Sequence, residues 1–420
     1  MSITTEIETL KTNLTNAYTS ISTKGGTIPT NKNAQNLATA INSIVTVREE
    51  AQEKDINFYD YEGTRLYSWT LAELASKTEL PELPTHDGLT CQGWNWSLAD
   101  LKNENAKMNV GAMYITNDGK TRIYIHLIKG YLSPYLGFSQ SVANGVEVDW
   151  GDGSPVETSS VEDSTTPVNM QHTYASEGSY IITLNPLNNC TIYIKGNSSS
   201  SRLLWAKDYT NLYLDIPYTC SIKKIELGRA VIINNYAFAA CKHLKSITMP
   251  NYISDIGQYT FWQTHNYNYI TIPNVVTAIP FCTFYYCYGL KTISIPKSVT
   301  QISGGYSFYN ANTLTNITLP SSITNIDQYS FGRTETLGII SIPKEVSTIY
   351  QKTFEYTTNL AYIDFSKHTS VPSLDNSTAF DNTAAFLKIV VPDNLYDTWI
   401  AATNWSSYAS KIIKASEWAT

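Results

Sequence analysis

A short pattern of hydrophobic and polar positions recurs through the second half of the chain. Each copy has a segment in which apolar residues alternate with Ser or Thr, and the segment ends at a proline. These prolines, 23 or 24 residues apart, are Pro250, Pro273, Pro296, Pro320 and Pro343. In phase with them stand the phenylalanines Phe238, Phe261, Phe284, Phe308, Phe331, Phe354 and, after a looser step, Phe380. The apolar residues six positions after each phenylalanine are Leu244, Tyr267, Leu290, Leu314, Leu337, Leu360 and Phe386. A period of this length predicts a solenoid of stacked repeats.

The alternation within one copy indicates how the repeats should stack. In the segment KTISIP, which ends at Pro296, the two isoleucines would point into the core while threonine and serine face outward. Proline has no N–H group to donate, so it ends each strand. We expect the phenylalanines to form a continuous buried stack. We also expect Ile272, Ile295, Leu319 and Ile342 to lie on adjacent parallel strands.

This repeat resembles the BspA-like leucine-rich repeat, whose copies read roughly L-x-x-I-x-I-P-x-x-V-x-x-I-x-x-x-x-F-x-x-C-x-x-L. The similarity is close over residues 222–365. Cys241 and Cys287 stand three residues after a repeat phenylalanine, where this family often has a buried cysteine. The resemblance implies a leucine-rich-repeat solenoid, which we place at residues 200–386.

The end of the chain, residues 387–420, is predicted to cap this solenoid. A terminal repeat must cover the open end of the stack. Pro392 fits the first turn of a helix, and Leu395, Trp399 and Ile400 would share one face of it. We therefore expect a helical cap.

Residues 1–47 have the spacing of short helices. Ile7, Leu10, Leu14 and Ile21 recur at the intervals of a coiled-coil seam, and Gly25 and Gly26 break the pattern. Two alternatives remain open: the helices pack on their own chain, or they serve self-association, for which we expect a trimer, or docking on a larger particle. Parts of residues 20–41 are similar to leader segments of structural proteins from phages that infect Gram-positive gut bacteria. That resemblance implies a virion protein whose N-terminus contacts other virion structural proteins.

Residues 48–120 read as a small β-rich domain. Alternating residues on both sides of Asn117, Asp118 and Gly119 predict a β-hairpin over 110–125. Residues 97–102 look like the start of a helix. Trp94 and Trp96, in the motif GWNW, could stack on a sugar, but we favour a role in an aromatic core.

Residues 121–190 contain the segment VEVDWGDGS at 146–154, followed by HTY at 172–174 and GSYIITL at 178–184. This constellation resembles a PKD-type immunoglobulin-like sandwich. Glu147, Asp149 and Asp152 could together hold Ca²⁺, because carboxylate oxygens suit that ion. We favour the alternative that these side chains form hydrogen-bonded turns.

Composition limits the function further. The net charge is −7, only 15% of residues are charged, and no basic run occurs, which argues against nucleic-acid binding. No run approaches the length of about 18 apolar residues that a membrane helix needs. The six cysteines lack metal-binding spacing, so we expect buried free thiols, no metal site and no cofactor.

We find no motif of an enzyme active site in the sequence. The acidic residues Asp255, Asp327, Glu345 and Glu355 occupy different phases of the repeat and do not obviously stack. A carboxylate-dependent glycan-cleaving enzyme is therefore the less favoured alternative. We expect a non-enzymatic protein.

The phases of the repeat that vary are the candidate recognition positions. Residues just after the repeat phenylalanines, and four positions after them, are rich in aromatic and polar side chains. We predict that a receptor-binding ridge is formed by Trp262, His265, Tyr285, Tyr286, Tyr288 and Tyr309. The open alternative is that these tyrosines only cover the phenylalanine stack.

These expectations combine into a virion structural protein with a mainly β fold. It would be a surface-exposed tail-fibre or baseplate adhesin that binds a host cell-surface glycan or protein through the solenoid. Residues 1–8 lack the basic and apolar regions of a secretory signal, so the expected location is the virion surface. A bacterial surface adhesin with a missing leader and a head-decorating fibre are the alternatives.

Overall fold

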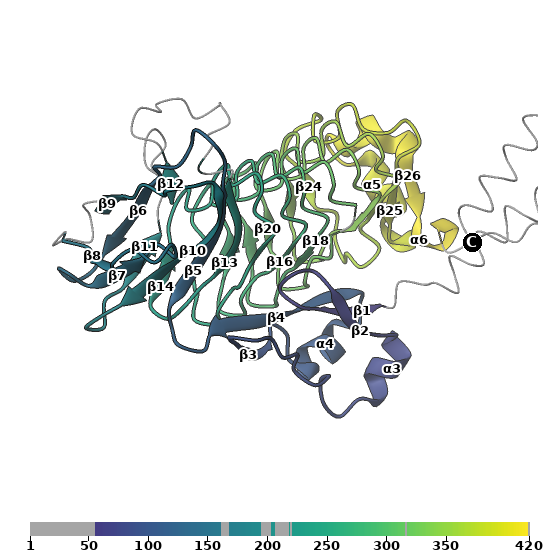
Figure 1. The fold of residues 1–420 in the computed structure, drawn as a ribbon. Coiled ribbons are helices and arrows are strands. Elements are labelled where there is room, and N and C mark those ends of the chain that lie inside the picture. Colours follow the sequence, from purple (N-terminus) through teal and green to yellow (C-terminus); the bar gives the residue numbers. More distant parts are fainter. Residues whose placement is uncertain are drawn as a thin grey trace, which may run out of the picture. The chain divides into compact units, whose positions relative to one another are not determined.

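The computed structural model describes residues 55–160, 168–194, 203–205, 218, 221–315 and 317–418. From Asp55 onward the chain forms one compact unit, and its fold is mainly β, as predicted. Figure 1 shows its strands and its few short helices. The predicted helices of residues 1–47, with Ile7, Leu10, Leu14 and Ile21, lie outside the described residues. In the described part of the chain, no helix is long and apolar enough to cross a membrane.

The small domain is built on a four-stranded sheet of order β2-β1-β4-β3. Its strands are β1 (Ile56–Tyr59), β2 (Arg65–Trp69), β3 (Leu89–Trp94) and β4 (Met108–Thr116). Its helices are α3 (Leu71–Ser76), which begins with a Thr70–Glu73 capping box, and α4 (Leu98–Glu104), which Ser97 caps. The helix start expected at residues 97–102 is α4. Phe58 and Trp94 pack edge to face in its core, and Trp96 is 3% exposed, so both tryptophans are core residues.

The predicted hairpin over residues 110–125 is wrong. The turn itself is present: Gly119 has φ +72°, and its N–H donates to the Thr116 carbonyl. The two strands beside it enter different sheets, however: β4 pairs with β1 and β3, whereas β5 (Thr121–Leu127) pairs with β10 and β13. Alternation identifies a half-buried strand but not its partner, and here each of the two strands pairs with strands from other parts of the chain.

A two-sheet sandwich follows the small domain. One sheet has the order β15-β13-β5-β10-β7-β8, and the other has the order β12-β6-β11-β14 with β9 paired to β6. Its remaining strands are β6 (Tyr135–Gln140), β7 (Val146–Asp149), β8 (Glu157–Thr158), β9 (Val168–Gln171), β10 (Gly178–Pro186), β11 (Ile192–Ile194), β12 (Leu204–Trp205), β13 (Ile222–Glu226), β14 (Val231–Ile233) and β15 (Ser246–Ile247). Trp150, Phe138 and Tyr174 are buried in its core.

The sandwich and the solenoid share a sheet. Strand β13 runs antiparallel to β5 of the sandwich and parallel to β15 of the repeats. Gly228 lies so close to Gly119 that a Cβ atom there would come within 2.2 Å of the Gly119 carbonyl oxygen. The first repeat therefore continues the sandwich sheet.

The solenoid carries two lines of short parallel strands. The first line, here called the strand line, contains β15, β16 (Tyr269–Thr271), β18 (Thr292–Ser294), β21 (Ile339–Ser341), β23 (Tyr362–Asp364), β25 (Lys388–Val391) and β26 (Ile412–Lys414). The second line contains β17 (Ala278–Ile279), β19 (Gln301–Ile302), β20 (Asn325–Ile326), β22 (Thr348–Ile349) and β24 (Ser373–Leu374). The seven phenylalanines stack with 5.2–5.7 Å between the ring centroids of neighbours, and none is more than 2% exposed. The predicted buried stack is confirmed.

The C-terminal end corrects two details of the prediction. Phe386 does not fill the closing position of its repeat: it is 60% exposed, and Leu387 is buried instead, because the last step is one residue longer. Strands β25 and β26 continue the strand line past residue 386, so the solenoid extends into the predicted cap. The cap adds η2 (Asp393–Leu395), α5 (Tyr396–Ala401), η3 (Trp405–Lys411) and α6 (Ala415–Trp418). Trp399 and Trp405 are fully buried there, against Phe365.

The described cysteines are free thiols. Cys190, Cys241, Cys282 and Cys287 are buried, and Cys91 is half-buried. This agrees with the expectation of small apolar core residues, and Cys220 lies outside the described part of the chain.

Candidate recognition surface

The repeat phenylalanines lie on a third side of the solenoid, here called the turn line. Positive and negative backbone φ angles alternate there in an unusual way. For the six phenylalanines from Phe238 to Phe354, the residues two positions before and two positions after have left-handed φ angles, such as +56° at Tyr259 and +57° at Gln263 around Phe261. The N–H groups of Phe261 and Gln263 donate to carbonyls of the next repeat, those of Thr283 and Tyr285. Non-glycine residues rarely adopt this conformation, which costs roughly 1 kcal/mol each. Neighbouring repeats are thus hydrogen-bonded along the turn line, which places side chains of the same phase side by side.

The aromatic side chains of the turn line form a continuous cluster, here called the aromatic ridge. It consists of Tyr236, Tyr259, Trp262, Phe281, Tyr285, Tyr286, Tyr288, Tyr306, Tyr309 and Tyr329. Phe281 links the first part to the second, with ring contacts of 5.2 Å to Tyr259 and 6.1 Å to Tyr306. Ten rings from five repeats therefore lie in one connected surface cluster.

Four of the six predicted recognition residues meet in the middle of this ridge. The Tyr285 ring lies 4.4 Å from that of Tyr286 and 5.5 Å from that of Tyr309, and Tyr286 lies 5.8 Å from Tyr288. All four side chains are half-buried. His265 is not a ridge member, but its ring contacts Tyr288 at 4.9 Å.

Trp262 is placed differently from the other predicted residues. It is only 7% exposed, and its indole packs against the rings of Tyr236 and Tyr259. It therefore supports the ridge and offers little contact area of its own.

The prediction missed the tyrosines that precede the phenylalanines. Tyr236 and Tyr259 stack at 4.6 Å with an interplanar angle of 5°, and Tyr306 and Tyr329 stack at 4.4 Å with an angle of 8°. Each stands two residues before a repeat phenylalanine. The recurrence of tyrosine at one phase in four repeats was a signal that could have found them.

These stacks limit what the ridge can present. The ring faces of Tyr306 and Tyr329 that touch each other are not available to a ligand, and the ammonium of Lys352 lies 5.6 Å from the Tyr329 ring centroid. Burial raises the pKa of the Tyr306 hydroxyl to about 12 and also raises the pKa of Tyr285. The hydroxyls of Tyr285 and Tyr306 are therefore neutral hydrogen-bonding groups at physiological pH.

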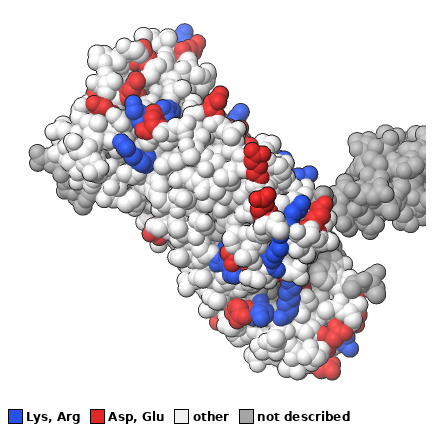
Figure 2. Space-filling model, turned by 90° about the horizontal axis from the view of Figure 1, so that it is seen from below, with Lys and Arg blue, Asp and Glu red and all other residues white. Residues whose placement is uncertain are grey.

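The C-terminal end of the ridge carries charge. The Arg333 guanidinium lies 4.6 Å from the centroid of the Tyr356 ring, and the Lys352 ammonium lies 3.4 Å from a Glu355 carboxylate oxygen. Both signs occur together, so this end is not a simple anion or cation site. On the face drawn in Figure 2, acidic and basic side chains are interspersed and separated by broad uncharged areas.

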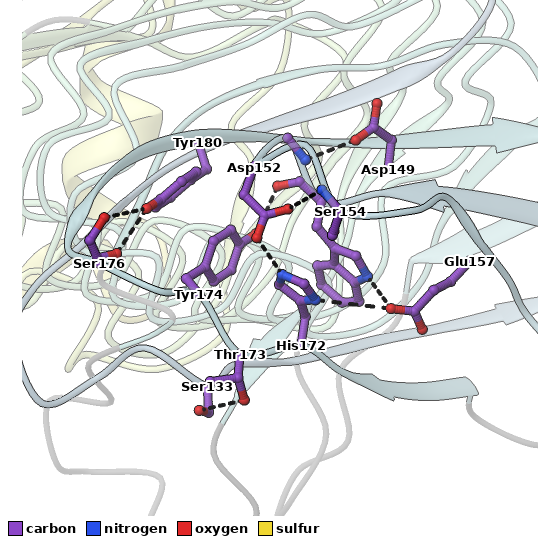
Figure 3. Close-up of polar contacts among 12 residues, drawn as sticks. Ser133, Asp149, Asp152, Ser154, Glu157, His172, Thr173, Tyr174, Ser176 and Tyr180 are labelled. Atoms are coloured by element: carbon purple, nitrogen blue, oxygen red, sulfur yellow. Dashed lines mark hydrogen bonds and ion pairs between the residues drawn. The ribbon is translucent and has the colours of Figure 1, made fainter.

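The candidate Ca²⁺ ligands of the sandwich point to separate partners. The Glu147 carboxylate accepts from Asn185 Nδ2 at 2.8 Å, and Asp149 Oδ1 accepts from the Gly151 N–H at 2.9 Å. Asp152 Oδ1 accepts from the Ser154 N–H at 3.0 Å (Figure 3). Asp149 and Asp152 thus act as turn-forming carboxylates. Over the described ranges, no cluster of three or more His, Cys, Asp or Glu side chains could hold a metal ion.

Asp152 instead belongs to a small polar network around Trp150. Its Oδ2 lies 2.7 Å from His172 Nε2 (Figure 3). The His172 ring stacks on that of Trp150 with 4.8 Å between the ring centroids. The Tyr174 hydroxyl donates to the Trp150 carbonyl at 3.0 Å, and the indole N–H donates to Glu157. Hydrogen bonds from Ser154 and then His172 lower the pKa of Asp152 to about 2. The network joins the loop after β7 to the loop after β9, and we assign it a structural role.

Comparison with known proteins identifies the repeats. Residues 216–306 and 302–400 match the family model for the BspA type leucine rich repeat region. The C-terminal part of the chain therefore carries BspA-type leucine-rich repeats, which confirms that part of the prediction. The match covers less than half of the chain, and no curated protein sequence is significantly similar to it.

Three solved structures illustrate the likeness. A leucine-rich repeat protein from T. pallidum is 20% identical, with 50% of this chain and 86% of that chain covered and a TM-score of 0.32. One from Bacteroides ovatus is 24% identical, with 46% and 54% covered and a TM-score of 0.35. A leucine rich cell surface protein from Faecalibacterium prausnitzii is 17% identical, with 55% and 92% covered and a TM-score of 0.23. At such TM-scores these likenesses carry no argument beyond the family match.

Proposed function

We propose that this protein is a non-enzymatic adhesin that attaches to a partner on a cell surface through the aromatic ridge. The observation that carries the proposal is the ridge itself, ten aromatic side chains from consecutive repeats in one connected cluster. Tyrosine supplies large, rigid contact area at low entropic cost, and aromatic side chains commonly dominate binding energy at interfaces. The proposal makes the turn line the recognition side of the solenoid.

The stacking within the ridge favours a protein over a glycan as the partner. A sugar ring packs against a free aromatic face, but Tyr236, Tyr259, Tyr306 and Tyr329 use faces against one another. Ring edges and neutral hydroxyls suit the mixed apolar and hydrogen-bonding contacts of a protein surface. Arg333 and Lys352, beside Glu355, would add polar contacts at the rim.

The setting that we propose is the surface of a virion. In this proposal residues 1–47 attach the protein to other virion structural proteins and bring it together as a trimer. The sandwich is a PKD-like spacer, supported by the contact of Tyr174 with Trp150 within the W-G-D-G and H-x-Y segments. The similarity of residues 20–41 to phage leader segments supports the virion origin.

The test is binding of the full chain to intact cells of candidate Gram-positive hosts. Tyr285→Ala with Tyr309→Ala should weaken binding at least about tenfold, because both rings lie at the centre of the ridge. Phe386→Ala is the matched control, since this aromatic side chain is 60% exposed outside the ridge and its loss should change nothing. Equal binding by the double variant and the control would refute the ridge as the site.

Treatment of the cells identifies the partner class. Loss of binding after protease treatment of the cells, with binding kept after periodate oxidation of their glycans, is the result expected for a protein partner. The opposite pattern would assign the ridge to a glycan.

A further inference from the structure

The motif GWNW of the small domain makes direct contact with the repeats. Asn95 Nδ2 donates to the carbonyl of Ile272 at 2.8 Å, and Trp96 Nε1 donates to the carbonyl of Ile295 at 3.1 Å. Asn95 is 1% exposed and Trp96 is 3% exposed. Two consecutive residues thus bind equivalent carbonyls of two consecutive repeats. In Figure 1 the small domain lies beside β16 and β18, the strands that Ile272 and Ile295 directly follow in the sequence.

The repeat prolines explain why these carbonyls are available. Strands β16 and β18 pair in parallel, with Thr271 opposite Ser294, and the Ile272 N–H donates to the Ser294 carbonyl. In this register the N–H of residue 296 would donate to the Ile272 carbonyl, but residue 296 is proline and has no N–H. The same holds one repeat later: Pro320 stands in the position whose N–H would donate to the Ile295 carbonyl. Each proline that ends a strand therefore leaves a carbonyl of the preceding repeat without its usual partner, and a buried carbonyl needs one.

The Asn95 side chain is held in place from both ends. Its Oδ1 accepts from the Gly111 N–H at 2.8 Å, and the Ser294 hydroxyl lies 3.0 Å from the same oxygen. A Cβ atom on Gly111 would come within 2.1 Å of Thr271 Oγ1, so only glycine allows β4 to approach this closely. The orientation of the amide is thus fixed by the small domain and by the repeat together.

Other contacts select these two repeats among those that end in proline. Tyr59 stacks on Tyr269 at 4.9 Å, and the Asp100 carboxylate lies 2.9 Å from the Lys297 ammonium. The repeat that ends at Pro296 has Thr292 four residues before the proline, whereas the repeat that ends at Pro343 has Ile339 there. The Ile339 side chain is 48% exposed. The carbonyl chemistry recurs along the strand line, but the flanking side chains differ.

We propose that residues 55–116 are a docking module whose ligand is the pair of carbonyls that prolines leave unpaired in consecutive leucine-rich repeats, and that Asn95 and Trp96 are the residues that bind it. This gives the small domain a function separate from the aromatic ridge. Its docking covers the outward side of β16 and β18, where Thr271 and Ser294 are buried, so no external partner reaches the strand line there. Recognition is then left to the turn line.

A double-mutant cycle in the full chain tests the proposal. Asn95→Leu removes the donor to the Ile272 carbonyl and also the acceptor of the Gly111 N–H, so the test reads amide exchange on the repeat side, at residues 269–272. Exchange there should speed up about tenfold, the effect of one lost hydrogen bond to a buried carbonyl. Pro296→Ala restores an N–H that can donate to Ile272 within the sheet. In the Pro296→Ala background, Asn95→Leu should therefore speed exchange only about twofold to threefold. Pro343→Ala is the matched control, because it restores an N–H far from the small domain and should leave the effect of Asn95→Leu unchanged.

Two outcomes would overturn the proposal: unchanged exchange in Asn95→Leu, or an equal effect of Asn95→Leu in the wild-type and Pro296→Ala backgrounds. If Asn95→Leu does not fold, Trp96→Phe keeps an aromatic ring and removes the Nε1 donor. The smaller phenyl ring also leaves a cavity, but that loss is common to both backgrounds and cancels in the cycle. The double-mutant cycle of Trp96→Phe with Pro320→Ala, also followed by amide exchange, then tests whether Trp96 binds the Ile295 carbonyl.

Discussion

The solenoid and the sandwich both bury aromatic side chains, but they hold them in different ways. In the solenoid the repeat phenylalanines contact one another from repeat to repeat, with similar spacings such as 5.2 and 5.4 Å on the two sides of Phe308. In the sandwich, Trp150, His172 and Tyr174 meet once, through a set of specific hydrogen bonds and one ring stack. Stability in the first region is a sum of similar neighbour contacts, whereas in the second it depends on a few polar partners. Substitutions in the two regions should therefore differ in size and even in sign.

The largest effect is expected from a cavity in the phenylalanine stack. Phe308 is fully buried between Phe284 and Phe331, with ring centroids at 5.2 and 5.4 Å. Phe308→Ala should lower the free energy of unfolding by about 3–5 kcal/mol. Chemical denaturation followed by circular dichroism measures this. A loss below about 1 kcal/mol would mean that neighbouring repeats do not depend on the stack.

The comparison also accounts for what could be predicted from the sequence. The phenylalanine stack could be predicted, because equivalent positions of adjacent repeats lie next to each other in a solenoid. Phe308 must therefore contact the phenylalanines one period before and after it. The partners of β4 and β5 could not, because the alternation around Gly119 fits a hairpin as well as two separate sheets. The period places Phe386 at the closing position, but the last repeat is one residue longer there and Leu387 is the buried residue.

The candidate site was predictable to the same extent. The cluster of Tyr285, Tyr286, Tyr288 and Tyr309 follows from the period, and so would Tyr306 if its phase had been considered. The burial of Trp262 could not be predicted, since it depends on how the rings of the preceding repeat pack over it. The contacts of Asn95 and Trp96 required a docking that no local pattern encodes.

Removal of one tyrosine hydroxyl in the sandwich should be destabilising. The Tyr174 hydroxyl donates to the buried Trp150 carbonyl at 3.0 Å, and Tyr174→Phe leaves that carbonyl without this partner. We expect a loss of about 1–2 kcal/mol. Thermal unfolding of the variant beside the wild type gives the value. An unchanged midpoint would show that the hydroxyl is dispensable and that ring packing alone joins the two loops.

Acid should weaken the same network before it affects the phenylalanine stack. The folded-state pKa of Asp152 is lowered to about 2 from the ordinary value of 3.8, by Ser154 and His172. Its contribution is therefore fully present above pH 3.8 and is lost as pH falls toward 2. Because Asp152 and His172 lie near the surface, we expect the free energy of unfolding to fall by only about 1 kcal/mol. Asp152→Asn should remove this part of the pH dependence, and an identical acid titration in both proteins would contradict it.

The same Tyr→Phe change in the solenoid should have the opposite sign. Tyr267 occupies the closing position that is leucine in most repeats, and its fully buried hydroxyl has no hydrogen-bond partner among the described residues. Burial raises its pKa well above the ordinary value, which fits an apolar site. Tyr267→Phe should leave stability unchanged or raise it by up to about 1 kcal/mol. A loss as large as that of Tyr174→Phe would mean that the hydroxyl has a partner after all.

Oxidative footprinting of tyrosines on the full chain, free and bound to host cell envelopes, tests most directly whether recognition lies on the turn line. Binding should protect Tyr285, Tyr286 and Tyr309 on the ridge, while Tyr131 on the sandwich, 42% exposed, should react equally in both states. Unchanged reactivity at the three ridge tyrosines together with protection of Tyr131 would contradict the assignment and place the binding site on the sandwich.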